Sequence, residues 1–69
     1  MQILAKDGDE FTIEIESSRA KVGNIIAVRD TDQTTMSCVI HRIIKNSPLR
    51  MGIVLARRAT NRELRKAGR

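Results

Sequence analysis

Residues 10–16 alternate strictly between apolar and polar side chains, and this pattern constrains the fold more than any other feature of the sequence. Phe11, Ile13 and Ile15 share one face, and acidic residues and a threonine occupy the other. Because successive side chains of a β-strand point to opposite faces, the alternation predicts a strand with one buried and one solvated side. This strand is expected to supply part of the core.

Four further segments are rich in apolar, mostly β-branched residues and are separated by turn-forming residues. They cover residues 2–5, 22–29, 35–44 and 51–56. The links between them contain Asp-Gly, short polar stretches and Asn-Ser-Pro, which are typical of turns and strand ends.

Five short strands with regular turns predict a mostly β fold, a small five-stranded β-barrel that occupies residues 1–56. The alternating face of the strand at 10–16 and the apolar runs 22–28 and 39–44 are expected to form its core.

The last part of the chain has a different pattern. Thr60, followed three residues later by Glu63, fits a capping box with Thr60 as the N-cap. Gly68 suits the C′ position just after a helix. Residues 57–69 are therefore predicted to be a basic, helical tail or linker, and an earlier helix start near Leu55 is the alternative.

A chain of 69 residues makes one domain and buries only about 60% of the surface of its unfolded form. Cys38 is the only cysteine, so no internal disulfide is possible, and its apolar neighbours favour a buried thiol over a reactive one. Self-association or a partner remains as a source of stability. The lone cysteine, the lack of about 20 consecutive apolar residues and the lack of a signal-peptide pattern predict a cytoplasmic protein without membrane contact.

No residue pattern predicts catalysis or a cofactor. His41 is the only histidine, and it lies three residues from Cys38 on a predicted strand, so the two side chains point to opposite faces. Whether His41 lies on the buried or the solvated face stays open. The acidic clusters at 7–10 and 30–32 lack the spacing of a calcium loop, and there is no phosphate-binding glycine motif. We therefore expect no enzymatic activity, no bound metal and no cofactor.

Positive charge is concentrated at the C-terminal end. Residues 1–49 contain six Lys or Arg and seven Asp or Glu, whereas residues 50–69 contain seven and one. A helix that includes Arg58, Arg62, Arg65 and Arg69 would present them on one face, and such a stripe can track nucleic-acid phosphates. The alternative is a solvated basic tail. The candidate nucleic-acid-binding residues are Arg57, Arg58, Arg62, Arg65, Lys66 and Arg69.

Three stretches within residues 3–49 carry a family resemblance: the alternating strand that starts at residue 9, the Gly turn and strand at 20–28, and the apolar strand at 39–44 with the Asn-Ser-Pro-Leu that follows. Together they resemble the HAS barrel, the small N-terminal β-barrel of HerA-type hexameric DNA translocases and of rotary ATP synthase subunits. The resemblance implies a barrel that does no chemistry, assists hexamer assembly and docks partners such as a nuclease. The P-loop ATPase domain of that family has no counterpart in these 69 residues, so ATP hydrolysis would lie outside them.

The leading hypothesis is therefore a non-catalytic β-barrel module for oligomer assembly and partner docking, with a homo-oligomer or a larger assembly as its expected state. The alternative is a stand-alone, small basic protein that binds DNA or RNA, or associates with a ribonucleoprotein, through its Arg-rich tail. Contact with a membrane surface is disfavoured, because the tail has few apolar residues to insert.

Overall fold

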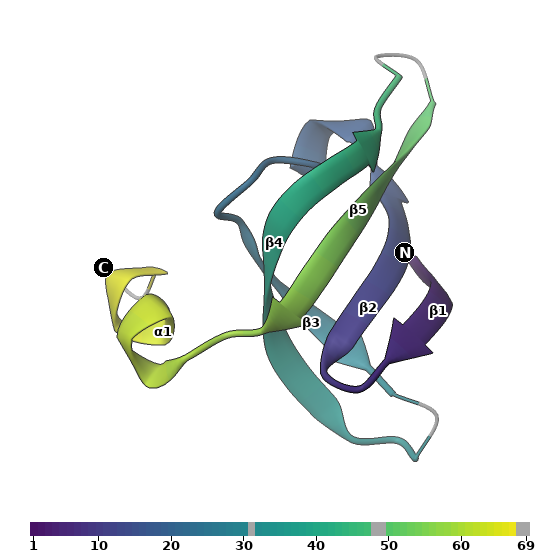
Figure 1. Ribbon diagram of the computed structural model, residues 1–69. Helices are drawn as coiled ribbons and strands as arrows, with labels where there is room; N and C mark the ends of the chain where they lie inside the picture. The colour runs from purple at the N-terminus through teal and green to yellow at the C-terminus, as the bar shows by residue number, and fades with distance from the viewer. Residues whose placement is uncertain (31, 48–49, 68–69) are drawn as a thin grey trace.

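The computed structural model describes residues 1–30, 32–47 and 50–67. It contains five antiparallel strands and a short C-terminal helix, which confirms the predicted mostly β fold. The elements are β1 (Gln2–Asp7), β2 (Glu10–Glu16), a 3-10 turn η1 (Ser17–Arg19), β3 (Ile25–Arg29), β4 (Thr35–Lys45), β5 (Met51–Arg58) and α1 (Asn61–Ala67). The strand order in the sheet is β1-β2-β5-β4-β3. Figure 1 shows the sheet curled into a half-barrel, with β2, β5 and β4 side by side and β3 behind them.

The two end strands of the sheet, β1 and β3, are linked by an ion pair. Lys6 of β1 donates a hydrogen bond of 2.5 Å to the carboxylate of Asp30, which directly follows β3. Asp30 is only 7% exposed, and the Lys6 ammonium lies 5.7 Å from the ring centroid of Phe11, its neighbour across the strands. A charge that is buried in this way needs such a partner. The acidic cluster at 30–32 was assessed from the sequence only as a calcium loop, so this contact was not predicted.

The core lies on the concave side of the sheet. Phe11, Ile13 and Ile15 of β2 are fully buried there, as the alternation predicted. The other strands and the turn after η1 contribute Ala20, Ile26, Val28, Cys38, Ile40, Val54 and Ala56. Burial raises the pKa of the Cys38 thiol, which keeps it protonated and confirms the predicted buried cysteine. Since a buried side chain of this size contributes about 1.5–3 kcal/mol, this cluster is the main source of stability.

The predicted strand at 22–29 begins three residues late, at Ile25. Gly23 has φ = 95°, a left-handed conformation that glycine adopts without steric cost, and its N–H donates to the carbonyl of Ile40. This turn places Val22 outside the core, where it is 64% exposed. The assignment of Val22 to a core strand was therefore wrong.

The expectation that residues 39–44 are all core was also wrong. The register of β4 against β5 shifts between Ile40 and Arg42 and again between Ile43 and Lys45. A shift of this kind, a β-bulge, interrupts the alternation of faces and bends the strand. Ile43 and Ile44 are consequently 36% and 54% exposed, and only Val39 and Ile40 of this run are buried.

The transition from sheet to helix also differs from the expectation. β5 continues through Arg58, so Arg57 and Arg58 belong to the sheet, and the Ala59 N–H still donates to the Ser37 carbonyl of β4. The helix begins only at Asn61, so neither the single helical stripe that included Arg58 nor a helix start near Leu55 is correct. Gly68 and Arg69 lie outside the described residues.

Candidate interaction surfaces

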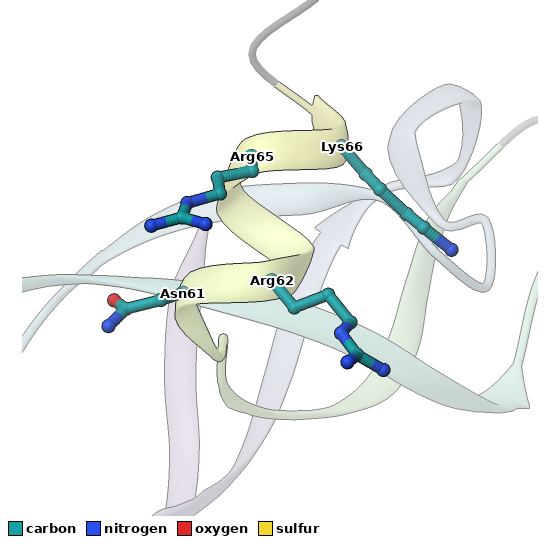
Figure 2. A pocket seen from close by; sticks show the side chains of 4 residues that line it. All are labelled: Asn61, Arg62, Arg65 and Lys66. Atoms are coloured by element: carbon teal, nitrogen blue, oxygen red, sulfur yellow. The ribbon is translucent and has the colours of Figure 1, made fainter.

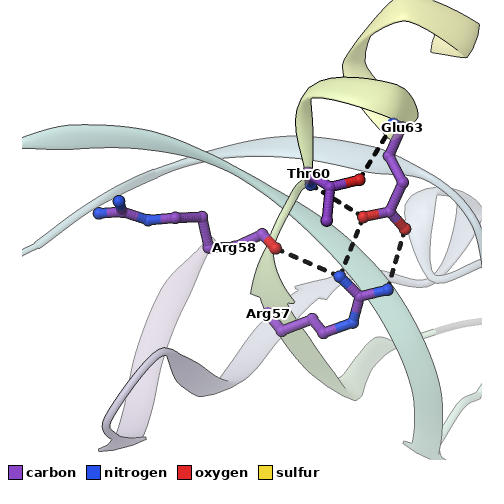
Figure 3. Close-up of polar contacts among 4 residues, drawn as sticks. All are labelled: Arg57, Arg58, Thr60 and Glu63. Atoms are coloured by element: carbon purple, nitrogen blue, oxygen red, sulfur yellow. Dashed lines mark hydrogen bonds and ion pairs between the residues drawn. The ribbon is translucent and has the colours of Figure 1, made fainter.

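The first turn of α1 is held by the predicted capping box. The Glu63 N–H donates to the Thr60 hydroxyl over 3.2 Å, and the Thr60 N–H donates to the Glu63 carboxylate over 2.9 Å. Figure 3 shows this reciprocal pair. The two bonds satisfy two of the donors that a helix N-terminus leaves free. A seven-residue helix that is marginal alone thus has a defined start.

Arg57 ties this helix back to the sheet. Its guanidinium donates two hydrogen bonds of 2.9 Å to the two carboxylate oxygens of Glu63, and a third of 3.3 Å to the Arg58 carbonyl (Figure 3). The Arg57 bond, helped by the Thr60 N–H, lowers the pKa of Glu63 to about 2, and Glu63 in turn raises the pKa of Arg57. Arg57, a candidate phosphate ligand, is therefore committed to an internal ion pair.

The remaining cations of α1 form a group that we call the helix cations, Arg62, Arg65 and Lys66. With Asn61 they line an open hollow on the helix, and their side chains extend from it in Figure 2. All three are exposed, and in the described part of the chain none forms an ion pair. The helix cations therefore face solvent, which both the nucleic-acid-binding hypothesis and the alternative of a solvated basic tail require, and contact with nucleic acid stays a prediction.

The other two candidate residues are not part of that group. Arg58 lies on β5 opposite Cys38, and its side chain extends away from Arg57 in Figure 3. It borders a separate shallow surface with Ala59, Leu64 and residues of β4. Arg69 is outside the described residues.

A second surface is the open edge of β4, defined as residues 41–45. On one side, the pairing of β4 with β3 ends at Val39, and Ile40 makes backbone hydrogen bonds to Gly23 and Asn24, just before β3. On the other side, the pairing of β4 with β5 continues to Lys45. Among residues 1–30, 32–47 and 50–67, the open edge is thus paired on one side only. It carries the exposed Ile43 and Ile44. Sequence reasoning missed this surface because bulges have no local residue signature and the run reads as core.

His41 lies on the open edge, and its ring nitrogen Nε2 is 3.0 Å from the Glu10 carboxylate of β2. Glu10 belongs to the solvated face of β2, so His41 lies on the solvated side of the sheet. The contact is exposed and, among the residues that the structure describes, includes no third group, which fits a surface hydrogen bond better than a proton-transfer site.

Among the described residues, no group of His, Cys, Asp and Glu is arranged to hold a metal ion. Within the same residues, no helix has the length and apolar character needed to cross a bilayer. No protein-family model, curated protein or solved structure matches this chain. The resemblance to the HAS barrel therefore stays a prediction.

Proposed function

We propose that this chain is a non-catalytic β-barrel module for oligomer assembly and partner docking. The observation that carries the proposal is the open edge of β4, where main-chain groups are paired on one side only and Ile43 and Ile44 face solvent. An edge of this kind adds a strand from another chain, because its free N–H and C=O groups supply the ladder and its side chains supply apolar contact.

The charges beside the open edge favour a specific partner over indiscriminate aggregation. Arg42 and Lys45 flank the two exposed isoleucines, so two open edges repel each other, and a second copy would have to supply a different strand. A partner strand that carries acidic residues is favoured instead. The resemblance to the HAS barrel, whose members assemble and dock partners, supports the same function.

Amide hydrogen exchange tests this proposal directly. We expect the amides of residues 41–45 to become protected as protein concentration rises, because an added strand pairs with them. Ile44→Lys should prevent this protection, since it removes an apolar contact and adds a charge. Thr35→Lys, an exposed position on the same strand outside the open edge, is the matched control and should behave like the wild type. Unchanged exchange at every concentration, with and without candidate partners, would refute the proposal.

The helix cations favour a second candidate function, which is nucleic-acid binding. Glu63, the only acidic residue of α1, is already paired with Arg57, so it does not neutralise Arg62, Arg65 or Lys66. Three exposed cations on one short helix can each neutralise a phosphate. Phe11 is fully buried, so binding would not involve stacking of a base on this ring.

Fluorescence anisotropy with duplex DNA at several salt concentrations tests this candidate. Three phosphate contacts predict a log–log salt slope of about −2.7, and the triple change of Arg62, Arg65 and Lys66 to alanine should abolish it. If the helix is deleted instead, the truncated chain should end after Ala59, because residues 57–59 still pair with the sheet. The candidate fails if the wild type shows no affinity at low salt, or if the triple variant binds equally well.

A further inference from the structure

The outer face of the sheet, defined as the side of β2, β5 and β4 that points away from the core, carries an ordered pattern of charge. Its middle strand is apolar, because Met51, Ile53 and Leu55 alternate with the core residues of β5. Figure 1 shows β5 between β2 and β4. β2 places acidic residues on one flank of this apolar stripe, and β4 places basic residues on the other.

The strand registers show how these side chains line up. Ile53 pairs with Glu14 of β2 on one side and with Lys45 of β4 on the other. Glu14, Lys45, Ile53 and Met51 line one shallow hollow together with Ser47 and a second cation, Arg50. The hollow thus has an apolar floor, an acidic wall and a basic wall.

Glu14 and Lys45 do not neutralise each other within one chain. They lie on the two strands that flank β5, two strand spacings or about 9.6 Å apart, with Ile53 between them. Neither forms an ion pair with any residue that the structure describes. Both charges therefore remain free for a contact with another molecule.

The pattern complements itself under one symmetry only. If two outer faces meet about a two-fold axis that runs along β5, β2 of each copy lies over β4 of the other. Glu14 of each copy then faces Lys45 of the second copy, and the apolar stripes meet in the middle. A two-fold axis across the strands would instead place acid on acid and base on base, which is unfavourable.

Charges beyond the outer face follow the same polarity. Asp7 at the end of β1 and Asp9 in the turn that follows lie next to the acidic flank. The helix cations lie beyond the basic flank, because Lys66 and Glu63 of α1 border Val39 of β4. The axis along β5 therefore turns the acidic side of each copy toward the basic side of the other.

We propose that two copies of this chain pack face to face through the outer faces of β2, β5 and β4, about a two-fold axis along β5. This inference rests on the proposed function in assembly and names a second copy as the partner, but it uses a surface different from the open edge of β4. Three strands and seven residues span roughly 14 by 23 Å per copy, and the contact is smaller than this because the outer face is the convex side of the curled sheet. That area is below the standard of about 800 Å² per partner, so the contact alone is weak and would require measurement up to hundreds of micromolar.

Charge reversal in sedimentation equilibrium tests this contact. We expect Glu14→Lys and Lys45→Glu each to weaken dimerisation by about tenfold or more, because each turns two attractive contacts per dimer into repulsive ones. The double variant Glu14→Lys/Lys45→Glu should restore wild-type association. An equimolar mixture of the two single variants should also associate, since each then meets the opposite charge. Lys21→Glu, at an exposed position outside the outer face and away from the charges beside it, is the matched control and should have a smaller effect.

The outcomes separate this inference from the proposed function. An oligomer that is lost in Ile44→Lys but is unchanged by the reversals at 14 and 45 overturns the face-to-face contact and leaves assembly through the open edge intact. Single reversals that weaken association without recovery in the double variant also overturn it. A chain that stays monomeric at every concentration overturns the face-to-face contact and self-assembly through the open edge, and leaves only docking of a different chain, which the exchange measurement tests. A thermal melt of each variant confirms that the fold is intact.

Discussion

At the scale of single residues, Gly52 shows how tightly the end of the half-barrel is packed. It lies on β5 opposite Ile15, beside the turn that follows β2. A Cβ at this position would lie 2.8 Å from the Asn46 amide oxygen, 3.2 Å from the Ala20 methyl group and 3.2 Å from the Lys45 carbonyl oxygen. The carbonyl belongs to the backbone and cannot rotate away, so the site accepts no side chain without a shift of the strands.

Gly52→Ala should therefore destabilise the fold by about 1–3 kcal/mol through overpacking. Urea unfolding followed by circular dichroism measures this loss. Gly8→Asn is the control, because Gly8 has φ = 63° with open space around it and asparagine tolerates that conformation. An unchanged midpoint for Gly52→Ala would contradict the packing described here.

The second prediction at this scale concerns the stability that the buried isoleucines contribute. Ile13→Ala and Ile26→Ala each remove a buried side chain and should cost about 2–5 kcal/mol, a large part of the 5–15 kcal/mol that typically stabilises a domain. Ile44→Ala makes the same chemical change at an exposed position and should cost far less in dilute protein. Thermal melts compare the three variants, and equal midpoints would contradict the assigned core.

At the scale of elements, α1 depends on contacts that its own sequence only partly supplies. The capping box is local, whereas the Arg57–Glu63 pair joins the helix to the end of β5. Since an isolated helix of seven residues is marginal, loss of the pair should lower the population of α1 while the barrel stays folded.

A pH titration tests this dependence. The pKa of Glu63 is lowered from 4.5 to about 2 in the folded state, so its contribution is complete above pH 4.5 and is lost as pH falls through about 2. We expect the Cα chemical shifts of residues 61–67 to report loss of helix over this window. Glu63→Gln keeps a capping side chain but not the ion pair, so its helix population should be lower at neutral pH and nearly constant over the window. A wild-type helix that does not respond between pH 4.5 and 2 would be inconsistent with the pair.

Local patterns determined how much of each element was predictable. The strict alternation of β2 and the Thr60 and Glu63 signature act within a few residues, so sequence reasoning placed both correctly. The bulges of β4 depend on its pairing with β5, which is why Ile43 and Ile44 were expected in the core. The pairs Lys6–Asp30 and Arg57–Glu63 depend on how strands and helix meet in space, and no spacing along the chain indicates them.

At the scale of the whole molecule, acidic and basic residues lie on opposite sides of the half-barrel, a separation of charge that the composition does not reveal. Acidic residues gather on the side of β1 and β2, and basic residues gather on the side of β4 and α1. The two ends of the half-barrel also differ. Lys6 and Asp30 connect β1 to β3, whereas the open edge of β4 extends beyond the last pairing of β4 with β3. A single domain of this size, with an open edge on β4 and opposite charges on its two sides, is suited to contact with another chain.

Sedimentation equilibrium of the unmodified chain, from about 1 µM to several hundred micromolar, is the most direct test of this conclusion. Weak contacts of small area predict a mean mass that rises above that of one 7.8 kDa chain as concentration increases, and that falls again with added salt. A mean mass that stays at one chain over the whole range, at low and high salt, would contradict self-assembly by this domain.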